Sequence, residues 1–197
     1  MKIIDSLVTQ AAGIASIRRD IHAHPELCFQ EVRTADVVAQ KLTEWGIPIH
    51  RGMGTTGVVG IVKGRDGGAN GRAVGLRADM DALPMQEFNT FAHASQHKGK
   101  MHACGHDGHT AMLLAAARHL AATRRFDGTV VLVFQPAEEG GGGAREMIKD
   151  GLFEKFPMEA VFGMHNWPGM PVGQFAVSSG PVMAFFIPSL VTSLMTR

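Results

Sequence analysis

Apolar residues recur at helical spacing twice in the first quarter of the chain. Residues 3–21 show this period, and residues 30–45 show it again before Gly46, a residue type that commonly caps helix C-termini. Between the two stretches, Pro25 disfavours a helical conformation at His24. The pattern therefore predicts two helices separated by a break at the proline.

Short apolar runs of a different kind follow. Residues 57–62 are rich in β-branched side chains and end in the turn-rich stretch 64–71, which we expect to form an exposed hairpin loop. Residues 73–76, 129–134 and 160–164 are continuous apolar runs without polar alternation. Such runs suit strands that are buried on both faces, as in a parallel sheet.

Helical segments separate these runs, at about residues 108–123 and 144–149. Strands that alternate with helices favour an α/β fold, so we predict a largely parallel sheet flanked by helices. A chain of 197 residues suits one domain with a sizeable core.

Amino-acid composition limits the binding partners and the cellular location that we expect for this protein. Hydrophobic residues make up 45% and charged residues 19% of the chain, as in ordinary soluble proteins, and the formal net charge is +1. Because no stretch concentrates Lys or Arg, we expect no nucleic-acid partner. No apolar run has the length of a membrane span or the pattern of a signal peptide, and two cysteines do not suggest a disulfide framework. We therefore expect no membrane partner and a cytoplasmic location.

Chemically active side chains follow the three continuous apolar runs. Asp79 and Asp81 come after the first run, Glu138 and Glu139 after the second, and His165 after the third. In open α/β sheets, ligands bind beyond the carboxyl ends of the strands. If the strands are parallel, these side chains converge on one rim of the sheet.

Residues 101–109 add a thiol and imidazoles just before a predicted helix. Cys104 and His106, taken with Glu139 and His165, offer thiolate, imidazole and carboxylate groups, which are ligands of first-row metal ions. The Cys-x-His spacing is weakly specific alone, and its combination with acidic and imidazole groups after separate strands is much more specific.

The adjacent carboxylates of Glu138 and Glu139 also indicate a cation. Two neighbouring buried carboxylates repel each other, and burying both without a cation is costly. A metal ion offsets this cost by taking one as a ligand. The other is then free to act as general base on a water whose pKa the metal lowers to about 7.

Plainer interpretations exist for several residues. Taken alone, Cys104 fits a buried structural cysteine, His165 a satisfied core histidine, and the glutamate pair a solvated helix start. We expect the remaining candidates to pack or to structure loops rather than to bind metal: His22, His24, Cys28, His102 and His109.

Five stretches resemble one family of enzymes. The chain resembles the N-acyl amino acid amidohydrolases of the hippurate hydrolase and auxin-conjugate hydrolase type, within the aminoacylase/carboxypeptidase group of dinuclear metallopeptidases. The likeness runs from about residue 17 to residue 184 and implies a zinc-exopeptidase-like catalytic domain. The matching stretches are HAHPEL (22–27), LRADMDALP (76–84), MHACGHDGH (101–109), QPAEEG (135–140) and GMHNWP (163–168).

This resemblance implies hydrolysis of the amide bond of an N-acyl amino acid by a water that two divalent metal ions activate. The resemblance implies manganese, zinc or cobalt as the ions, and the ligand set does not choose among them, because cysteine favours softer ions and glutamate harder ones. Glu138 would be the general base, and Asp79 would orient a metal ligand. The metal ligands would be Cys104, His106, Glu139 and His165.

Members of this family are longer than this chain. We expect residues 1–184 to be the N-terminal portion of the catalytic domain, without the lid and dimerisation domain or the later metal-binding histidine of the family. Residues 185–197 are apolar and show no family pattern, so we predict that they are not native to the fold. With a ligand and the lid missing, we expect the chain alone to have little or no hydrolase activity. Full-length relatives are expected to be homo-oligomers, and the state of this chain stays open.

Other functions compete with this hypothesis. A dipeptide or diaminopimelate-conjugate hydrolase, or a non-catalytic metal-binding remnant, would carry the same motifs. A zinc-finger-like module fits the spacing of Cys104, His106 and His109, but the other candidate ligands follow core strands and no basic surface is expected. A zinc deaminase fits poorly because its His-x-Glu and Pro-Cys-x-x-Cys signature is absent.

Overall fold

A computed structural model describes residues 4–177 and residue 179. The chain divides into two units, Met1–Asn166 and Trp167–Arg197, and all helices and strands of the described residues belong to the first. The predicted atypical tail, residues 185–197, lies outside the described residues. In chain order the elements are α1 (Asp5–Ala23), α2 (Val32–Glu44), β1 (Ile49–Met53), β2 (Gly57–Lys63), β3 (Ala73–Asp79), α3 (His106–Thr123), β4 (Thr129–Gln135), α4 (Gly143–Lys149), α5 (Leu152–Lys155) and β5 (Ala160–Gly163).

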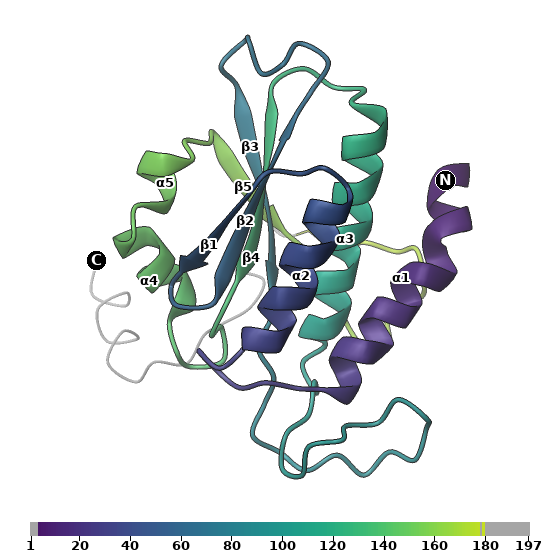
Figure 1. Cartoon of the computed structure of the whole chain (residues 1–197). Coiled ribbons are helices and arrows are strands. Elements are labelled where there is room, and N and C mark those ends of the chain that lie inside the picture. Colours follow the sequence, from purple (N-terminus) through teal and green to yellow (C-terminus); the bar gives the residue numbers. More distant parts are fainter. Residues whose placement is uncertain (1–3, 178, 180–197) are drawn as a thin grey trace. The chain divides into compact units, whose positions relative to one another are not determined.

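The described strands form one sheet in the order β1-β2-β4-β3-β5 (Figure 1). β4 and β5 both pair with β3 in parallel, whereas β2 pairs with β1 and β4 in antiparallel fashion. The predicted α/β fold is therefore confirmed, with a mixed sheet whose parallel part contains the three strands that precede the candidate site residues. The predicted hairpin at residues 64–71 is wrong, because β4 lies between β2 and β3 and the loop crosses its end.

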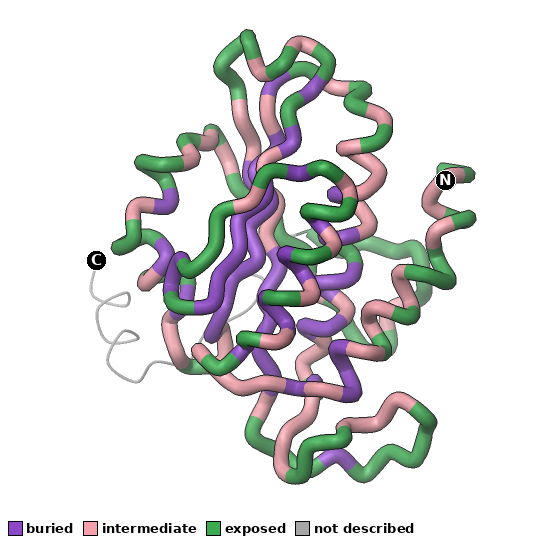
Figure 2. Tube along the Cα trace, in the orientation of Figure 1, coloured by how far each residue is buried: buried purple, intermediate pink, exposed green. Residues whose placement is uncertain are grey.

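Helices cover both faces of the sheet, which explains the continuous apolar runs. α2 and α3 pack on one face, with α1 against α3, and α4 packs on the other face beside α5 (Figure 1). Along β4, Val130, Leu132 and Phe134 face the first layer, and Val131 and Val133 face the second. Every residue from the second position of β4 onward is buried, and Figure 2 shows burial concentrated in the central strands. Both side-chain directions of a strand are thus apolar when helices cover both faces.

β5 departs from the prediction of a strand buried on both faces. Val161 is 44% exposed and Phe162 is 59% exposed. In the described part of the chain β5 pairs with β3 alone and forms the edge of the sheet. An apolar run therefore identifies a strand, but whether neighbours cover it depends on the rest of the fold.

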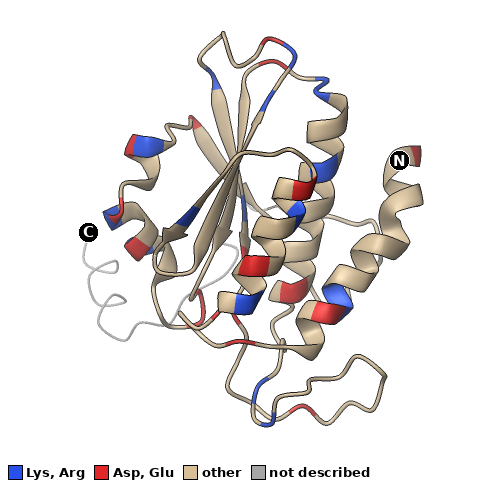
Figure 3. Ribbon diagram, viewed as in Figure 1, with Lys and Arg blue, Asp and Glu red and all other residues tan. Residues whose placement is uncertain are grey.

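The predicted helices are present with small changes in their bounds. α2 ends at Glu44, and Gly46 adopts a left-handed conformation with φ +68°, as a C-terminal cap requires. Among the described residues, none of the helices combines the length and apolar composition that crossing a bilayer demands. Lys and Arg are scattered over several elements of the described chain rather than gathered on one of them (Figure 3).

Candidate metal centre

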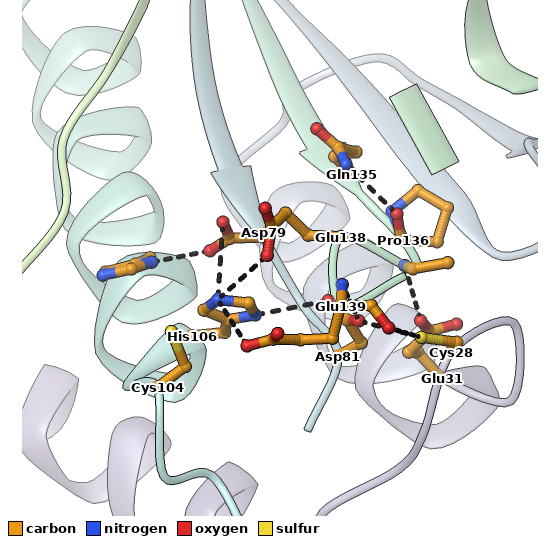
Figure 4. A network of polar contacts seen from close by, with 12 residues as sticks. Cys28, Glu31, Asp79, Asp81, Cys104, His106, Gln135, Pro136, Glu138 and Glu139 are labelled. Carbon is orange, nitrogen blue, oxygen red and sulfur yellow. Dashed lines mark hydrogen bonds and ion pairs between the residues drawn. The ribbon is translucent and has the colours of Figure 1, made fainter. Parts of the chain in front are cut away.

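The parallel strands bring the predicted site residues to one rim. Asp79, the last residue of β3, lies opposite Gln135, the last residue of β4, and Gly163 at the end of β5 lies opposite Arg77. The segments after these three strands therefore start from the same edge of the sheet. The first residue of α3, His106, meets them there (Figure 4).

His106 is fully buried at the centre of this rim. Its Nδ1 lies 3.2 Å from Oδ1 of Asp81. Its Nε2 has no hydrogen-bond partner among the described residues and lies 3.6 Å from Oδ2 of Asp79, 3.8 Å from Oε2 of Glu138 and 3.7 Å from Oε1 of Glu139. Asp81 therefore fixes the ring so that Nε2 points at three carboxylates (Figure 4).

Cys104 and His165 complete the cluster. The Sγ of Cys104 lies 3.3 Å from Nε2 of His165. Between Cys104 and α3, Gly105 adopts φ +90°, and a Cβ there would lie 2.5 Å from Oδ1 of Asn166. The turn before α3 thus requires glycine for its conformation and for the close approach of the segment that carries His165.

The donor atoms fit a metal ion. The ligand atoms of Cys104, His106 and His165 all lie within 4.8 Å of one another, and so do those of His106, Glu138 and Glu139. Nε2 of His106 and Oε1 of Glu139 are buried without a hydrogen-bond partner in the part of the chain that the structure describes. Buried polar atoms without partners are costly, and a cation between them would satisfy both. The structure thus places the four predicted ligands in two overlapping groups that share His106.

Burial and nearby negative charge shift the pKa values of the side chains at this rim. Burial and the charge of Glu139 raise the pKa of Glu138. Burial and the adjacent Glu139 carboxylate raise the pKa of the Cys104 thiol to about 12. The pKa of His106 is also raised, because the carboxylates of Asp81 and Asp79 outweigh the opposing effect of burial. The cluster therefore carries excess negative charge, which favours the binding of a cation.

Asp79 has different partners from those of Asp81. Its Oδ1 accepts a hydrogen bond of 2.6 Å from Nδ1 of His109, and Nη1 of Arg77 lies 2.7 Å from Oδ2. Burial alone would raise the pKa of Asp79, but His109, His106 and Arg77 together hold it well below its usual range. Asp79 thus orients His109 directly, whereas the carboxylate that holds a predicted metal ligand is Asp81.

His109 uses both ring nitrogens within the protein. Its Nδ1 contacts Oδ1 of Asp79 at 2.6 Å, and its Nε2 contacts both the backbone N–H of Asn166 at 3.1 Å and the side-chain oxygen of Asn166. His109 also belongs to a third group of possible ligands, with Asp79 and His106, in the described chain. His102 is buried, and both its ring nitrogens lack a partner among the described residues. Burial lowers the pKa of His102 to about 4, so it is neutral.

The sequence did not predict that Asp81 contacts His106 and the Glu139 backbone, or that Cys28 contacts the same backbone. Asp81 Oδ2 accepts the backbone N–H of Glu139 at 2.9 Å, and the Cys28 thiol donates to the carbonyl oxygen of Glu139 at 3.0 Å. The spacing of Asp79 and Asp81 was a usable signal, because residues two apart at a strand end point to the same side. Nothing in the spacing indicates which of the two contacts His106.

A second polar cluster ties α1 to α3 near this rim. His22, in the last turn of α1, places Nδ1 2.8 Å from Oδ2 of Asp107 and Nε2 3.2 Å from Oε1 of Glu87. Arg18 contacts the same Asp107 oxygen at 3.3 Å, and its other nitrogen lies 3.3 Å from Nε2 of His93. His22 therefore links helix α1, the loop after β3 and the start of α3.

This cluster predicts a pH-dependent contribution to stability. The hydrogen bond to Asp107, together with Glu87, raises the pKa of His22 above 6.5 despite its burial. The stabilisation by charged His22 is therefore fully present below its unfolded-state pKa and is lost as the pH rises through the folded-state value. The pKa values of His93, His102, Asp107 and Glu87 are all lowered, so His22 alone of these groups titrates above pH 6.5.

We expect His22→Gln to lower the free energy of unfolding by roughly 1.5–3 kcal/mol at pH 6, the range for hydrogen bonds to charged groups, and by less at pH 9. Urea denaturation of both proteins across this pH range measures the difference. A difference that stays constant between pH 6 and pH 9 would contradict the charged bridge.

The chain is similar to known proteins both in sequence and in structure. Residues 75–186 match the model of the family described as peptidase family M20/M25/M40. The chain is 48% identical over 184 residues to hippurate hydrolase of Campylobacter jejuni, covering 93% of this chain and 47% of that enzyme. It is 46% identical over 172 residues to the IAA-amino acid hydrolase ILR1-like 4 of Arabidopsis thaliana, covering 87% of this chain and 38% of that one.

Among solved structures, the chain is similar to the Bacillus subtilis YXEP protein, a dinuclear metal binding peptidase from the M20 family. The TM-score is 0.81 and the identity 42%, covering 90% of this chain and 48% of that one. The chain thus spans about half the length, or less, of the relatives that it matches.

Proposed function

Because the chain belongs to peptidase family M20/M25/M40, we propose that it is the metal-binding part of an amidohydrolase that cleaves a small N-acyl amino acid. The observation that carries the proposal is the convergence of unpartnered Nε2 of His106 and Oε1 of Glu139 beside the Cys104 thiol and His165, within the described residues. Thiol, imidazole and carboxylate donors together suit first-row divalent ions.

Two divalent metal ions are proposed, as in the dinuclear structural neighbour. The residues that would hold them are Cys104, His106, Glu139 and His165. When bound, they would lower the pKa of a water and polarise the carbonyl of the scissile amide. This donor set mixes soft and hard ligands, so it suits manganese, zinc or cobalt without selecting one of them.

Glu138 is the proposed general base. Its side chain is 32% exposed, so it can reach a substrate, and its raised pKa suits a group that takes and returns a proton near neutral pH. Glu138 accepts a proton from the attacking water as oxygen bonds to the amide carbon. It then delivers this proton to the nitrogen as the carbon–nitrogen bond breaks, releasing a carboxylic acid and an amino acid.

Asp81 and Asp79 hold the imidazoles in place. Asp81 bonds Nδ1 of His106 and leaves Nε2 free toward the carboxylates, which is the support that metal-binding histidines commonly have. Asp79 bonds His109, which in turn holds the Asn166 backbone next to His165. The proposed role of Asp79 is therefore to fix the segment that carries His165.

The substrate class follows from the relatives. Hippurate hydrolase and the IAA-amino acid hydrolases are named for substrates in which an amide joins an acyl group to an amino acid. We therefore propose an N-acyl amino acid of this kind, with dipeptide-like conjugates as a close alternative.

Manganese titration followed by incubation with N-benzoylglycine tests the proposal. We expect stoichiometric metal binding together with release of glycine and benzoate. Metal binding without any turnover would instead support the non-catalytic metal-binding alternative. Absence of metal binding would overturn both.

A further inference from the structure

Glu31 is a fully buried carboxylate that the proposed chemistry does not use. It lies just before α2, in the linker that follows α1. Its Oε1 accepts the backbone N–H of Phe29 at 3.1 Å and that of Ala137 at 2.8 Å, and its Oε2 accepts the hydroxyl of Thr56 at 2.6 Å. One side chain therefore joins the segments at residues 29, 56 and 137, which are far apart in the sequence, and residue 137 directly precedes the proposed base and ligand.

Each of these segments contains a residue in a strained backbone conformation. Phe29, Thr55 and Ala137 have φ values of 60°, 79° and 49°, and these are three of the four non-glycine residues with positive φ in the described chain. Positive φ is uncommon for residues with a Cβ, and for a bulky or β-branched residue it is a genuine outlier. Strained conformations persist only where surrounding contacts hold them. The bonds to Phe29, Thr56 and Ala137 identify the Glu31 carboxylate as one of those contacts.

The turn at Ala137 sets the direction of the next two side chains. Ala137 is buried. Gly143 packs so closely on Pro136, the residue before Ala137, that a Cβ on Gly143 would lie 1.8 Å from the Pro136 oxygen. Asp81 and Cys28 hold the following backbone through the N–H and carbonyl groups of Glu139. At the start of the turn, Glu31 holds the backbone in the same way by accepting the N–H of Ala137.

We propose that Glu31 is a positioning residue that holds the strained turn at Ala137, so that Glu138 and Glu139 face Nε2 of His106. The inference deepens the proposed function, on which it rests. No positively charged side chain lies within ion-pair distance of Glu31 among the described residues, and its contacts are all hydrogen-bond donors of the segments that it joins. Its role is therefore to accept hydrogen bonds at fixed places rather than to balance a charge.

Substitution by glutamine separates this role from charge. In Glu31→Gln, the carbonyl oxygen of the new amide can replace Oε1 and accept both backbone N–H groups. The amide nitrogen then donates to the Thr56 hydroxyl, which becomes the acceptor of that bond. Glu31→Gln should therefore preserve the turn. Glu31→Ala leaves the Ala137 N–H without an acceptor, so the turn at Ala137 should lose its fixed conformation.

Glu26 provides a matched control in the same linker. Its carboxylate accepts the backbone N–H groups of Arg33 and Thr34 and the Thr34 hydroxyl, so it also joins two backbone donors and one hydroxyl. These partners lie in the first turn of α2 and not in the segment that carries Glu138. Glu26→Ala should reduce stability without changing the metal site.

Cobalt titration of the four proteins tests the proposal, with the cobalt–thiolate absorption band as the signature of Cys104 beside the other ligands. We expect Glu31→Ala to weaken cobalt binding about 10–100-fold, the usual cost of removing a supporting contact, and to alter the band. Glu31→Gln and Glu26→Ala should remain within about threefold of the unsubstituted chain. An unchanged affinity and band in Glu31→Ala, or an equal loss in Glu26→Ala, would overturn the positioning role.

Amide hydrogen exchange in the metal-free chain gives a readout that does not depend on metal binding. Faster exchange at Ala137 and Glu139 in Glu31→Ala, with β4 unchanged, is expected, and unchanged exchange at these amides would overturn the inference. If the unsubstituted chain binds no cobalt, the proposed function fails and the exchange data still decide whether Glu31 holds the turn. If Glu31→Ala does not fold, Thr56→Val removes one donor and should show the same changes in exchange and affinity at a smaller amplitude.

Discussion

Replacing Glu138 with glutamine is expected to lower the rate of N-benzoylglycine hydrolysis by roughly 10²–10⁴-fold without weakening metal binding. Glutamine has the same shape but cannot accept the proton of the attacking water. Glu138 is more exposed than Glu139, and its pKa is raised by burial and by the Glu139 charge, as suits a base that must later return its proton.

Initial rates of glycine release over long incubations measure this effect even where turnover is slow. Glu154→Gln is the matched control, because Glu154 lies exposed on α5 away from the rim. The control should keep the rate of the unsubstituted chain. Turnover by Glu138→Gln within about threefold of that rate would remove Glu138 from the mechanism.

Replacing His106 with alanine should weaken divalent-metal binding by more than about 100-fold, the upper range for loss of a supporting residue. His106 belongs to every group of three possible ligands found in the described residues. Its Nε2 lies between Asp79, Glu138 and Glu139, so its loss removes the nitrogen donor that all of these groups share.

Zinc titration monitored by equilibrium dialysis quantifies this loss, with circular dichroism to verify that the variant is folded. His119→Ala is the control on the same helix, since Nδ1 of His119 contacts the Ser6 hydroxyl at 3.1 Å, away from the rim. We expect the control to bind zinc normally. Binding by His106→Ala within about threefold of the unsubstituted chain would show that the cluster is not the metal site.

The sequence predicted the parallel part of the fold because its strands are continuous apolar runs, which helices bury on both faces along β4 but not along the edge strand β5. It also predicted that polar residues after these runs meet, since parallel strands share a carboxyl edge. It did not predict β1, because Ile49–Met53 contains exposed polar residues at the outer edge of the sheet and lacks an apolar period. It predicted the wrong partner for β2, since local turn residues show where a chain bends but not which strand it then joins.

Within the candidate site, the residue types were more predictable than their partners. Metal-ligand chemistry is visible in Cys104, His106, Glu139 and His165 because few other roles suit that combination. The support provided by Asp81 and Glu31 depends on contacts between segments distant in sequence, such as Glu31 with Ala137, which no local pattern encodes. The predictions for residues 185–197, for a cytoplasmic location and for the roles of the site residues stay predictions.

X-ray absorption spectroscopy of the zinc-loaded chain tests the central claim most directly. We predict a sulfur neighbour at about 2.3 Å together with nitrogen and oxygen neighbours at about 2.0–2.1 Å, and loss of the sulfur signal in Cys104→Ser with Cys28 intact. A spectrum with nitrogen and oxygen neighbours alone, or a sulfur signal that persists in Cys104→Ser, would contradict a metal centre built on Cys104 and His106.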